Sequence, residues 1–349
     1  MTNSPYAVLE KEDVNPASSV IESSYAELKR LIERHGLLKP QPLYYTYKTI
    51  LAFLMVISAW IILLTADSMW IKLLDAAFLA FATTQLGFIA HDAGHRQIFK
   101  AAWKNDMVGL MNVLFVGASY FWWVETHNKH HSKPNQLAYD PAIDYSVLAF
   151  SNEQALSKRG IQRFLIKYQA WLFIPMMALY PISMRIDSIR FLLQGKHRSR
   201  HLEAFLMIVH FVLYFPLLFF AFGPWMAILF MVIHESLFGL YLVSVFVPNH
   251  MGMVILEDGT DLDFLTQQVI TARNIKGHPL VDFWYGGLNY QIEHHLFPKM
   301  ARNRLRKAKR IVEDFCREKS IGYYETGFFQ SYREILRDLH RVSAALRSA

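Results

Sequence analysis

The stretch Leu73–His95, with the sequence LLDAAFLAFATTQLGFIAHDAGH, decides the fold. Its apolar part carries one acid, Asp75, and is long enough for a helix across a hydrocarbon core, which takes about 20 residues. The run Ile50–Ala66 precedes it without a charged residue, and only residues 67–72 separate the two runs. The stretch is therefore predicted to be the second helix of a transmembrane hairpin and to end in a pair of histidines.

A second hairpin is predicted further along the chain. The apolar run Ala204–Phe222 is followed at once by Gly223-Pro224 and by the run Trp225–Val247. Strand signals are scarce throughout, and no internal repeat is evident. The predicted fold class is therefore an all-α integral membrane protein with four transmembrane helices in two hairpins, interfacial helices and a cytoplasmic helical cap.

The composition agrees with a membrane protein. Of the 349 residues, 53% are hydrophobic and 19% are charged, which excludes a disordered chain and a simple basic nucleic-acid-binding domain. The single cysteine, Cys316, excludes a disulfide framework, a zinc ribbon and an iron–sulfur cluster held by the chain's own thiolates. Fifteen histidines are unusually many for such a protein, and the net charge of +7 predicts a surface that meets anions.

Two more apolar stretches are interpreted as interfacial helices and not as spans. Met107–Val124 ends in an aromatic run, and Tyr168–Met184 is broken by Pro175 and Pro181. Hydropathy alone leaves an arrangement with six spans open. Shorter amphipathic helices are predicted at Ser24–Leu38, Asn303–Lys319 and Tyr332–Leu346.

Basic residues set the predicted orientation. Two hairpins put both termini and the segment between them on one side, which holds clusters such as Arg302–Arg310 (RNRLRKAKR), whereas the turns hold only Lys72. The positive-inside rule makes the basic side cytoplasmic. We expect a multi-pass protein of a bacterial-type plasma membrane. Its predicted parts are a cytoplasmic N-terminal segment 1–46, a membrane domain 47–300 that contains the histidine clusters, and C-terminal helices 301–349 that belong to the same domain.

Three histidine clusters follow or flank the predicted spans. They are HDAGH at 91–95, HNKHH at 127–131 and QIEHH at 291–295. Because residues three and four apart share one face of a helix, each cluster can direct its side chains at a common point. Imidazole is a ligand for iron, copper, zinc and nickel. The candidate metal ligands are His91, His95, His127, His130, His131, His294 and His295.

The number of histidines predicts two metal ions. A zinc site takes about three or four protein ligands, and seven histidines with one glutamine exceed that number. The Glu-x-x-His pairs of di-iron carboxylate bundles are absent, so a histidine-rich pair of redox metals that uses dioxygen is favoured. A shared site also requires all three clusters on one side of the membrane. Met107–Val124 then cannot cross the bilayer, and four spans are favoured over six.

Polar residues near the clusters supply further candidates. His250, just past the fourth run, is predicted to be a metal ligand; the alternative is an interfacial histidine with Asn249 as a turn residue. Asn249 is the weaker candidate, as a direct or water-mediated ligand. His234 precedes His250 by about 24 Å along a straight helix, so His234 and Glu235 either serve packing or line the deep part of a tunnel. Acids can orient metal-bound histidines by accepting their second N–H. The acids near the clusters are Asp92, Glu125, Asp140, Asp144, Asp282 and Glu293.

The chain resembles the membrane-bound fatty acid desaturases. The boxes HDAGH, HNKHH and QIEHHLFP, the last at Gln291–Pro298, match that family's three-box signature within a resemblance that covers about residues 45–340. A glutamine at the start of the third box, preceded by GGLNY at Gly286–Tyr290, is similar to the front-end desaturases of the Δ6 type. Those enzymes insert a double bond between an existing one and the carboxyl end.

The resemblance implies an O2-dependent oxidoreductase that introduces a cis double bond into a fatty acyl chain linked to coenzyme A or to a lipid. It implies two iron ions held by the seven histidines, with Gln291 in a slot that is otherwise histidine and His250 as an extra ligand. It also implies a cytoplasmic active site at a narrow hydrophobic tunnel. Since the N-terminal region lacks the HPGG motif of a fused cytochrome b5 domain, we expect electrons from a separate ferredoxin, cytochrome or flavoprotein.

Other functions stay open as alternatives. A lipid or alkane hydroxylase or ketolase of the same superfamily needs the same oxidant, so the boxes alone do not separate it from a desaturase. A zinc intramembrane protease, which HDAGH superficially resembles through HExxH, leaves two boxes unexplained. A metal transporter is a further alternative, but transport sites lie near the bilayer midplane, whereas the three boxes lie past the ends of the predicted spans. The basic surface that includes Arg304, Arg306 and Lys307 is expected to dock an acidic electron donor, or to bind phosphates or anionic lipid.

Overall fold

The computed structural model describes residues 18–195 and 197–347, and this part of the chain falls into two compact units. The first, called the box unit below, consists of the residues up to Lys39, residues 126–173 and the residues from Val245 onward. The second, called the span unit, consists of residues 40–125 and 174–244. Helices α5, α8 and α10 contribute residues to both units.

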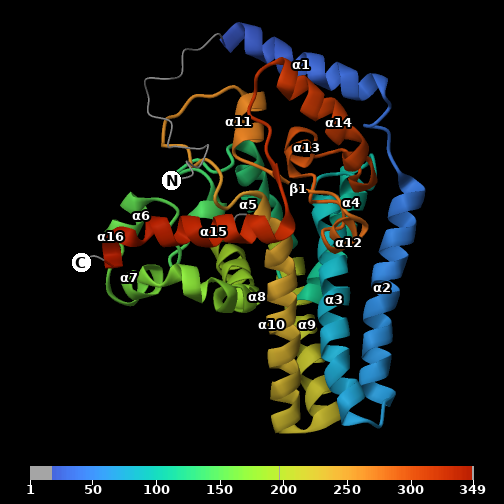
Figure 1. Ribbon diagram of the computed structural model, residues 1–349. Coiled ribbons are helices and arrows are strands. Elements are labelled where there is room, and N and C mark those ends of the chain that lie inside the picture. Colours follow the sequence, from blue (N-terminus) through green and yellow to red (C-terminus); the bar gives the residue numbers. More distant parts are fainter. Residues whose placement is uncertain (1–17, 196, 348–349) are drawn as a thin grey trace. The chain divides into compact units, whose positions relative to one another are not determined.

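Long apolar helices build the span unit (Figure 1). They are α2 (Pro42–Thr65), α3 (Met69–Gly94), α4 (Ala102–Val116), most of α8 (Gln169–Gln194), α9 (Arg200–Phe222) and most of α10 (Pro224–Phe246). α2 begins with Pro42, whose fixed φ suits a first helical turn. Gly223, with a φ of +74°, ends α9 and lets Pro224 start α10 at once. The helices of both predicted hairpins are thus present.

Five helices in the described part of the chain are long and apolar enough to cross a membrane. They are the four predicted ones, α2, α3, α9 and α10, and in addition α8. The prediction that Pro175 and Pro181 break this stretch is wrong, because α8 continues through both. Gly239 of α10 lies against α8 at this point: a Cβ there would stand 2.5 Å from the Met177 carbonyl oxygen and 2.6 Å from the Pro181 ring. The glycine lets α10 pack directly on the segment where proline removes a helical hydrogen bond.

The stretch Met107–Val124 forms two helices, where one was expected. α4 ends at Val116, and α5 (Tyr120–Ser132) begins after a bend of 114°. Gly117 at the bend has a φ of +71°, and a Cβ there would stand 2.5 Å from the ring of His210. A left-handed glycine packed this closely turns the chain, so the stretch does not form one straight helix.

The box unit contains shorter helices and a two-stranded parallel sheet in its described residues. They are α1 (Ser18–Arg34), η1 (Pro141–Ile143), α6 (Asn152–Ser157), α7 (Gly160–Lys167), η2 (Val247–Asn249), α11 (Phe264–Ile270), β1 (Asn274–Ile275), α12 (Pro279–Trp284), α13 (Gln291–Leu296), α14 (Arg302–Glu318), β2 (Glu325–Thr326), α15 (Phe328–Val342) and α16 (Ala344–Arg347). Buried side chains of α1, α11, α13 and α14, among them Ile32, Val269, Leu296 and Leu305, form one core. This core fixes α13, which carries the third histidine box.

The predicted amphipathic helices correspond to α14, to α15 with α16, and to α1. α1 ends at Arg34, four residues earlier than expected. Gly36, with a φ of +66°, donates to the Glu33 carbonyl, and Leu37 donates to that of Ile32, which closes the helix with a left-handed glycine cap.

Polar residues inside the span unit bond to one another. Arg185 of α8 donates to both carboxylate oxygens of Glu235 of α10, at 2.6 and 3.0 Å, and to the Val116 carbonyl at the end of α4, at 3.1 Å. The next residue, His234, hydrogen-bonds through Nδ1 to the Tyr214 hydroxyl of α9 at 2.8 Å. Of the two roles expected for His234 and Glu235, these contacts support packing, because they tie four helices together.

We predict that Arg185→Leu lowers the free energy of unfolding in detergent by about 2 kcal/mol, because it leaves the partly buried Glu235 carboxylate without its cation. The double variant Arg185→Leu/Glu235→Leu is expected to recover most of that loss. Denaturant or thermal unfolding of the purified proteins measures both. If single and double variants are equally destabilised, the ion pair is not the source of the effect.

Candidate metal centre

The box unit brings together histidines from three segments. α5 carries the second box, His250 follows η2 directly, and α13 carries the third box. His130, His250 and His295 each offer a ring nitrogen, and these three atoms lie within 4.8 Å of one another. The Nε2 atoms of His130 and His250 are 3.3 Å apart. We call these three residues the histidine triad.

An oxygen atom faces the second nitrogen of each ring in the histidine triad. Nδ1 of His130 lies 2.8 Å from a carboxylate oxygen of Asp140. Nδ1 of His250 lies 3.1 Å from the Thr271 carbonyl oxygen, and Nδ1 of His295 lies 2.8 Å from the side-chain oxygen of Gln268. Because these oxygens accept hydrogen bonds, each Nδ1 can donate to its partner, and Nε2 is then the nitrogen that each ring can offer to a metal ion. Three such nitrogens close together are a donor set that fits a metal ion.

Charges around the triad agree with this arrangement. Burial, and then the neighbouring His130, lower the pKa of His250 to about 3, so this ring is neutral near pH 7. Burial alone would raise the pKa of Asp140, but His130 and the backbone N–H groups of Ala142 and Asn135 lower it below its ordinary value. A neutral histidine such as His250 can bind a metal ion through a ring nitrogen. A charged carboxylate such as that of Asp140 orients the histidine that it faces, here His130.

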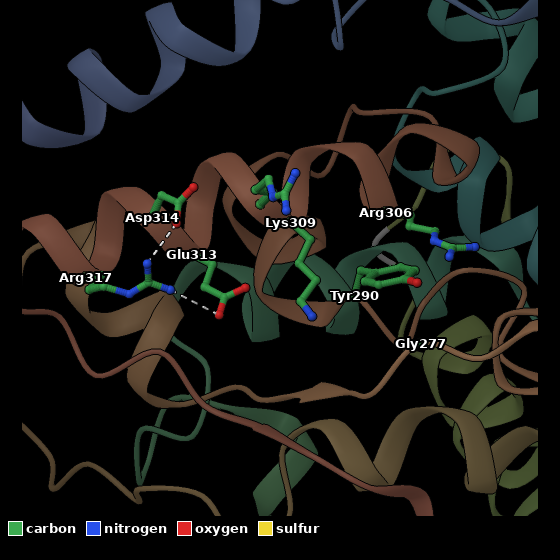
Figure 2. Close-up of a pocket in the computed structure, with 8 residues that line it drawn as sticks. Gly277, Tyr290, Arg306, Lys309, Glu313, Asp314 and Arg317 are labelled. Atoms are coloured by element: carbon green, nitrogen blue, oxygen red, sulfur yellow. Dashed lines mark hydrogen bonds and ion pairs between the residues drawn. The ribbon is translucent and has the colours of Figure 1, made fainter.

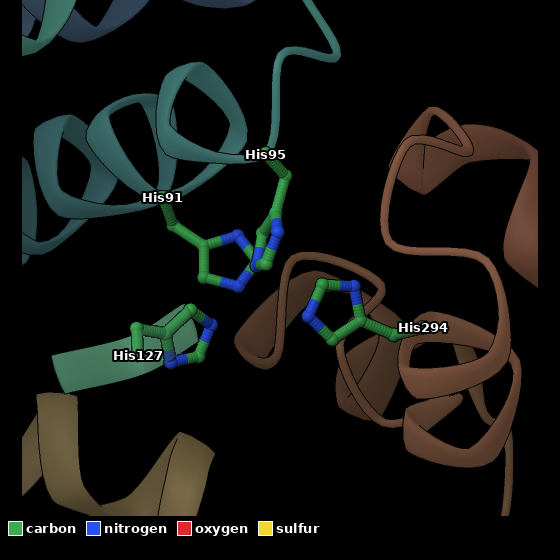
Figure 3. A group of neighbouring side chains, drawn as sticks. All are labelled: His91, His95, His127 and His294. Atoms are coloured by element: carbon green, nitrogen blue, oxygen red, sulfur yellow. The ribbon is translucent and has the colours of Figure 1, made fainter. Parts of the chain in front are cut away.

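The remaining histidines of the second and third boxes lie beside the triad. The Nε2 atoms of His127 and His131 are 3.1 Å apart, and His131 stacks on His295 with ring centroids 4.1 Å apart. The His294 ring centroid is 4.8 Å from that of His131. It is 6.4 Å from that of His127, and Figure 3 draws this second pair. All five histidines of these two boxes, together with His250, therefore form one contiguous group.

The first box lies at the end of α3 in the span unit. His91 and His95 are one helical turn apart, and their ring centroids are separated by 4.7 Å (Figure 3). Nδ1 of His91 lies 3.1 Å from a carboxylate oxygen of Asp92. Both rings are buried. As the sequence spacing predicted, the two histidines of this box face one another.

A family model described as fatty acid desaturase matches residues 68–327, which is more than half of the chain. The chain belongs to the fatty acid desaturase family. Named relatives agree with this assignment. An acyl-lipid (9-3)-desaturase of Physcomitrium patens is 29% identical over 96% of this chain and 65% of its own length. A desaturase of the same name from Borago officinalis is 28% identical over 81% of this chain and 66% of its own length.

A third relative comes from a nematode. A delta(6)-fatty-acid desaturase of Caenorhabditis elegans is 27% identical over 97% of this chain and 81% of its own length. The chain spans slightly less than two thirds of the length of the first two relatives.

Gln291 and Asn249 lie beside the histidine triad. The amide nitrogen of Gln291 is 3.0 Å from Nε2 of His250, and its oxygen accepts a hydrogen bond from the Asn249 amide at 3.1 Å. Asn249 also donates to the carbonyl groups of Val245 and Leu288. In this arrangement Gln291 presents its donor nitrogen to the triad, while Asn249 holds the Gln291 amide in place.

The acids expected to orient histidines divide into two groups. Asp92 and Asp140 face histidine nitrogens, as described above. Glu293 instead accepts hydrogen bonds from Asn274 and Tyr323, and burial raises its pKa to about 7. Asp282 accepts from Asn289 and Tyr290. Glu125 lies on α5, and Asp144 follows η1.

Two of the three acceptors behind the histidine triad were missed by sequence reasoning. Gln268 and Thr271 belong to α11 and its C-cap, and neither is an acid, the residue type expected as an orienting partner. A glutamine amide has no charge to mark it, and the backbone carbonyl of Thr271 has no sequence signature. Only the folded structure shows that α11 and its C-cap place two acceptors behind the histidine triad.

A polar surface pocket of about 550 Å³ lies along α14, and no residue of the histidine triad lines it (Figure 2). Its lining includes Tyr290 and residues of both charges. The ion pairs there are Arg306 with Asp282 at 3.3 Å, Lys309 with Glu325 at 2.5 Å, and Arg317 with Glu313 and Asp314 at 3.5 and 3.0 Å. Within the residues that the structure describes, Arg310 lines the pocket without an ion pair. This pocket is no metal centre, but it belongs to the predicted basic surface.

We predict that His250→Ala weakens binding of Co²⁺, used as a spectroscopic stand-in for iron, by more than about 100-fold, because loss of a ligand exceeds the 10- to 100-fold effect of losing an orienting partner. Titration of the purified apoprotein measures the affinity. His278→Ala, which changes an exposed histidine at the start of α12, is the control and should bind as the wild type does. Equal affinities for both variants would remove His250 from the centre.

Proposed function

We propose that this protein is an O2-dependent fatty acyl desaturase that introduces a cis double bond into an acyl chain. The observation that carries the proposal is the histidine triad, in which three Nε2 lone pairs converge within a chain of the desaturase family. Neutral imidazoles of this kind suit iron. The proposal includes two iron ions, dioxygen as co-substrate and electrons from an external electron-transfer protein.

The proposed ligands are the box histidines and His250, with Gln291 beside them. The triad and the neighbouring His127, His131 and His294 supply the nitrogen donors in the box unit, and His91 and His95 supply those of the first box. Asp140 holds the ring of His130, and Asp92 that of His91. The chain's division into 1–46, 47–300 and 301–349 is part of the same proposal.

When bound, the iron ions supply the oxidising power, taken from dioxygen and two electrons, that removes one hydrogen from each of two adjacent methylenes and leaves water. The protein's own contribution is to fix the ligand rings. Buried acceptors hold each Nδ1–H, so the rings of the triad do not rotate when substrate arrives. Burial of His130 and His295 keeps bulk water away from the reacting carbons.

The substrate is proposed to be a long acyl chain linked to a lipid or to coenzyme A. Two of the relatives are named acyl-lipid desaturases and one is named a delta(6)-desaturase, which favours a front-end position for the new bond. A hydroxylase or ketolase remains the rival reaction, because it uses the same oxidant. Family membership argues against a zinc protease and a metal transporter.

The membrane topology is proposed to have four spans, with both termini and the histidine boxes in the cytoplasm. The positive charge of α14 supports this orientation. α8 is long and apolar enough to be a fifth span, and it carries Arg185 and two prolines. The named relatives are eukaryotic, so they lend no support to a bacterial plasma membrane.

Fatty-acid profiling tests the proposed reaction. Expression in a host without desaturases, fed saturated and monounsaturated chains, should give products lighter by two hydrogens, with the new bond located by mass spectrometry. His130→Ala should abolish them, because the triad loses a ligand, whereas the exposed His35→Ala should not. Products that gain oxygen would establish the hydroxylase reading, and full activity of His130→Ala would refute both.

The electron donor is proposed to dock on the exposed basic side of α14. Lys307 and Arg310 are exposed and have no ion pair among the described residues, so their charge is available to an acidic partner. Arg306 is partly neutralised by Asp282, and Arg317 by Glu313 and Asp314.

We predict that the double variant Lys307→Glu/Arg310→Glu slows reduction by an acidic [2Fe–2S] ferredoxin by about tenfold at low ionic strength and flattens its salt dependence. Stopped-flow oxidation of the ferredoxin measures the rate. Arg317→Ala is the matched control on the same helix and should change little. An unaltered salt dependence in the double variant would place the docking surface elsewhere.

A further inference from the structure

One buried side chain links the second histidine box to the third. Gln268 on α11 is fully buried. Its amide nitrogen donates to the His131 carbonyl oxygen at 3.0 Å, and its amide oxygen lies 2.8 Å from Nδ1 of His295. The same amide therefore contacts the backbone of α5 and a ring on α13.

The two contacts together fix the protonation of the His295 ring. A carbonyl oxygen only accepts, so the amide end of Gln268 that faces His131 has to be the NH2 group. The oxygen then faces His295, and Nδ1 of that ring has to donate. Nε2 of His295 is left as the lone-pair donor that the histidine triad presents to a metal.

α11 holds Gln268 rigidly. Leu265 and Val269 on the same helix are fully buried in the box-unit core, and Asp263 caps the helix by accepting from the Thr266 N–H. Thr271, directly after the helix, supplies the carbonyl that faces Nδ1 of His250. α11 therefore orients two of the three rings, and Gln268 is the side chain through which it acts on His295.

We propose that Gln268 is a positioning residue of the metal centre, which selects the Nδ1–H tautomer of His295 and sets the distance between the second and third boxes. The inference rests on the proposed function in one respect, that the histidine triad binds metal. Gln268 itself touches neither metal nor substrate; it acts through His295.

Two substitutions of Gln268 separate its contact with His295 from its contact with His131. Gln268→Leu removes both contacts and should weaken Co²⁺ binding by about 10- to 100-fold, the usual effect of losing an orienting partner of a ligand. Gln268→Glu keeps an acceptor for His295 but loses the donor to His131. It should bind within about tenfold of the wild type and shift the Co²⁺ absorption bands, because a carboxylate makes the ring a stronger electron donor.

Gln267→Leu is the matched control. Gln267 is the neighbouring buried glutamine on α11, and its amide donates to Gln136 at 3.4 Å and not to a histidine. The change removes the same chemical group from the same helix, so it should cost comparable stability and leave Co²⁺ affinity and spectrum unchanged.

The experiment is a Co²⁺ titration of the purified full-length apoprotein in detergent, followed by absorption spectroscopy, with thermal unfolding recorded for each variant. Weakened binding by Gln268→Leu, with a shifted spectrum for Gln268→Glu and an unchanged Gln267→Leu, supports the proposal. Wild-type affinity in Gln268→Leu overturns it. If Gln268→Leu does not fold, a wild-type spectrum in Gln268→Glu overturns it. A wild-type protein that binds no Co²⁺ refutes the proposed metal centre itself, and the inference with it.

Discussion

The convergence of three Nε2 lone pairs is the constraint on which the box unit depends. The Nε2 atoms of His130 and His250 lie 3.3 Å apart, while Nδ1 of each ring faces an oxygen atom, of Asp140 and of Thr271 respectively. The surrounding fold has to hold the rings in this arrangement. It does so from behind, with one acceptor for each Nδ1.

The backbone around the histidine triad is irregular, and buried side chains hold it. The Asn135 amide donates to the carbonyl groups of His250, Val254 and Thr271, while its backbone N–H donates to Asp140. Arg273, fully buried, donates to the carbonyls that flank His250, those of Pro248 and Met251. Buried carbonyl groups outside helices need such partners, and here the partners also fix where His250 points.

Much of this arrangement could be predicted from the sequence. Four apolar runs became helices, because backbone groups in a membrane have to bond within their own segment, and the i, i+4 spacing of His91 and His95 placed their rings together. The continuity of α8 through Pro175 and Pro181 could not be predicted from the local sequence, nor could the packing of Gly239 of α10 against Met177 and Pro181. The roles of Gln268 and Thr271 could not be predicted either, because nothing in the sequence indicates which group an uncharged amide or a backbone carbonyl will face.

The close approach at Gly239 has a mechanical consequence. Pro181 of α8 lies against Gly239 of α10. One helical turn further along α8, Arg185 bonds to Glu235, which lies one turn before Gly239 in α10. The two helices therefore run in opposite directions. A steric contact and an ion pair about 6 Å apart along the axis fix both sliding and rotation of these antiparallel helices. A motion of either helix within the span unit therefore has to carry the other helix with it.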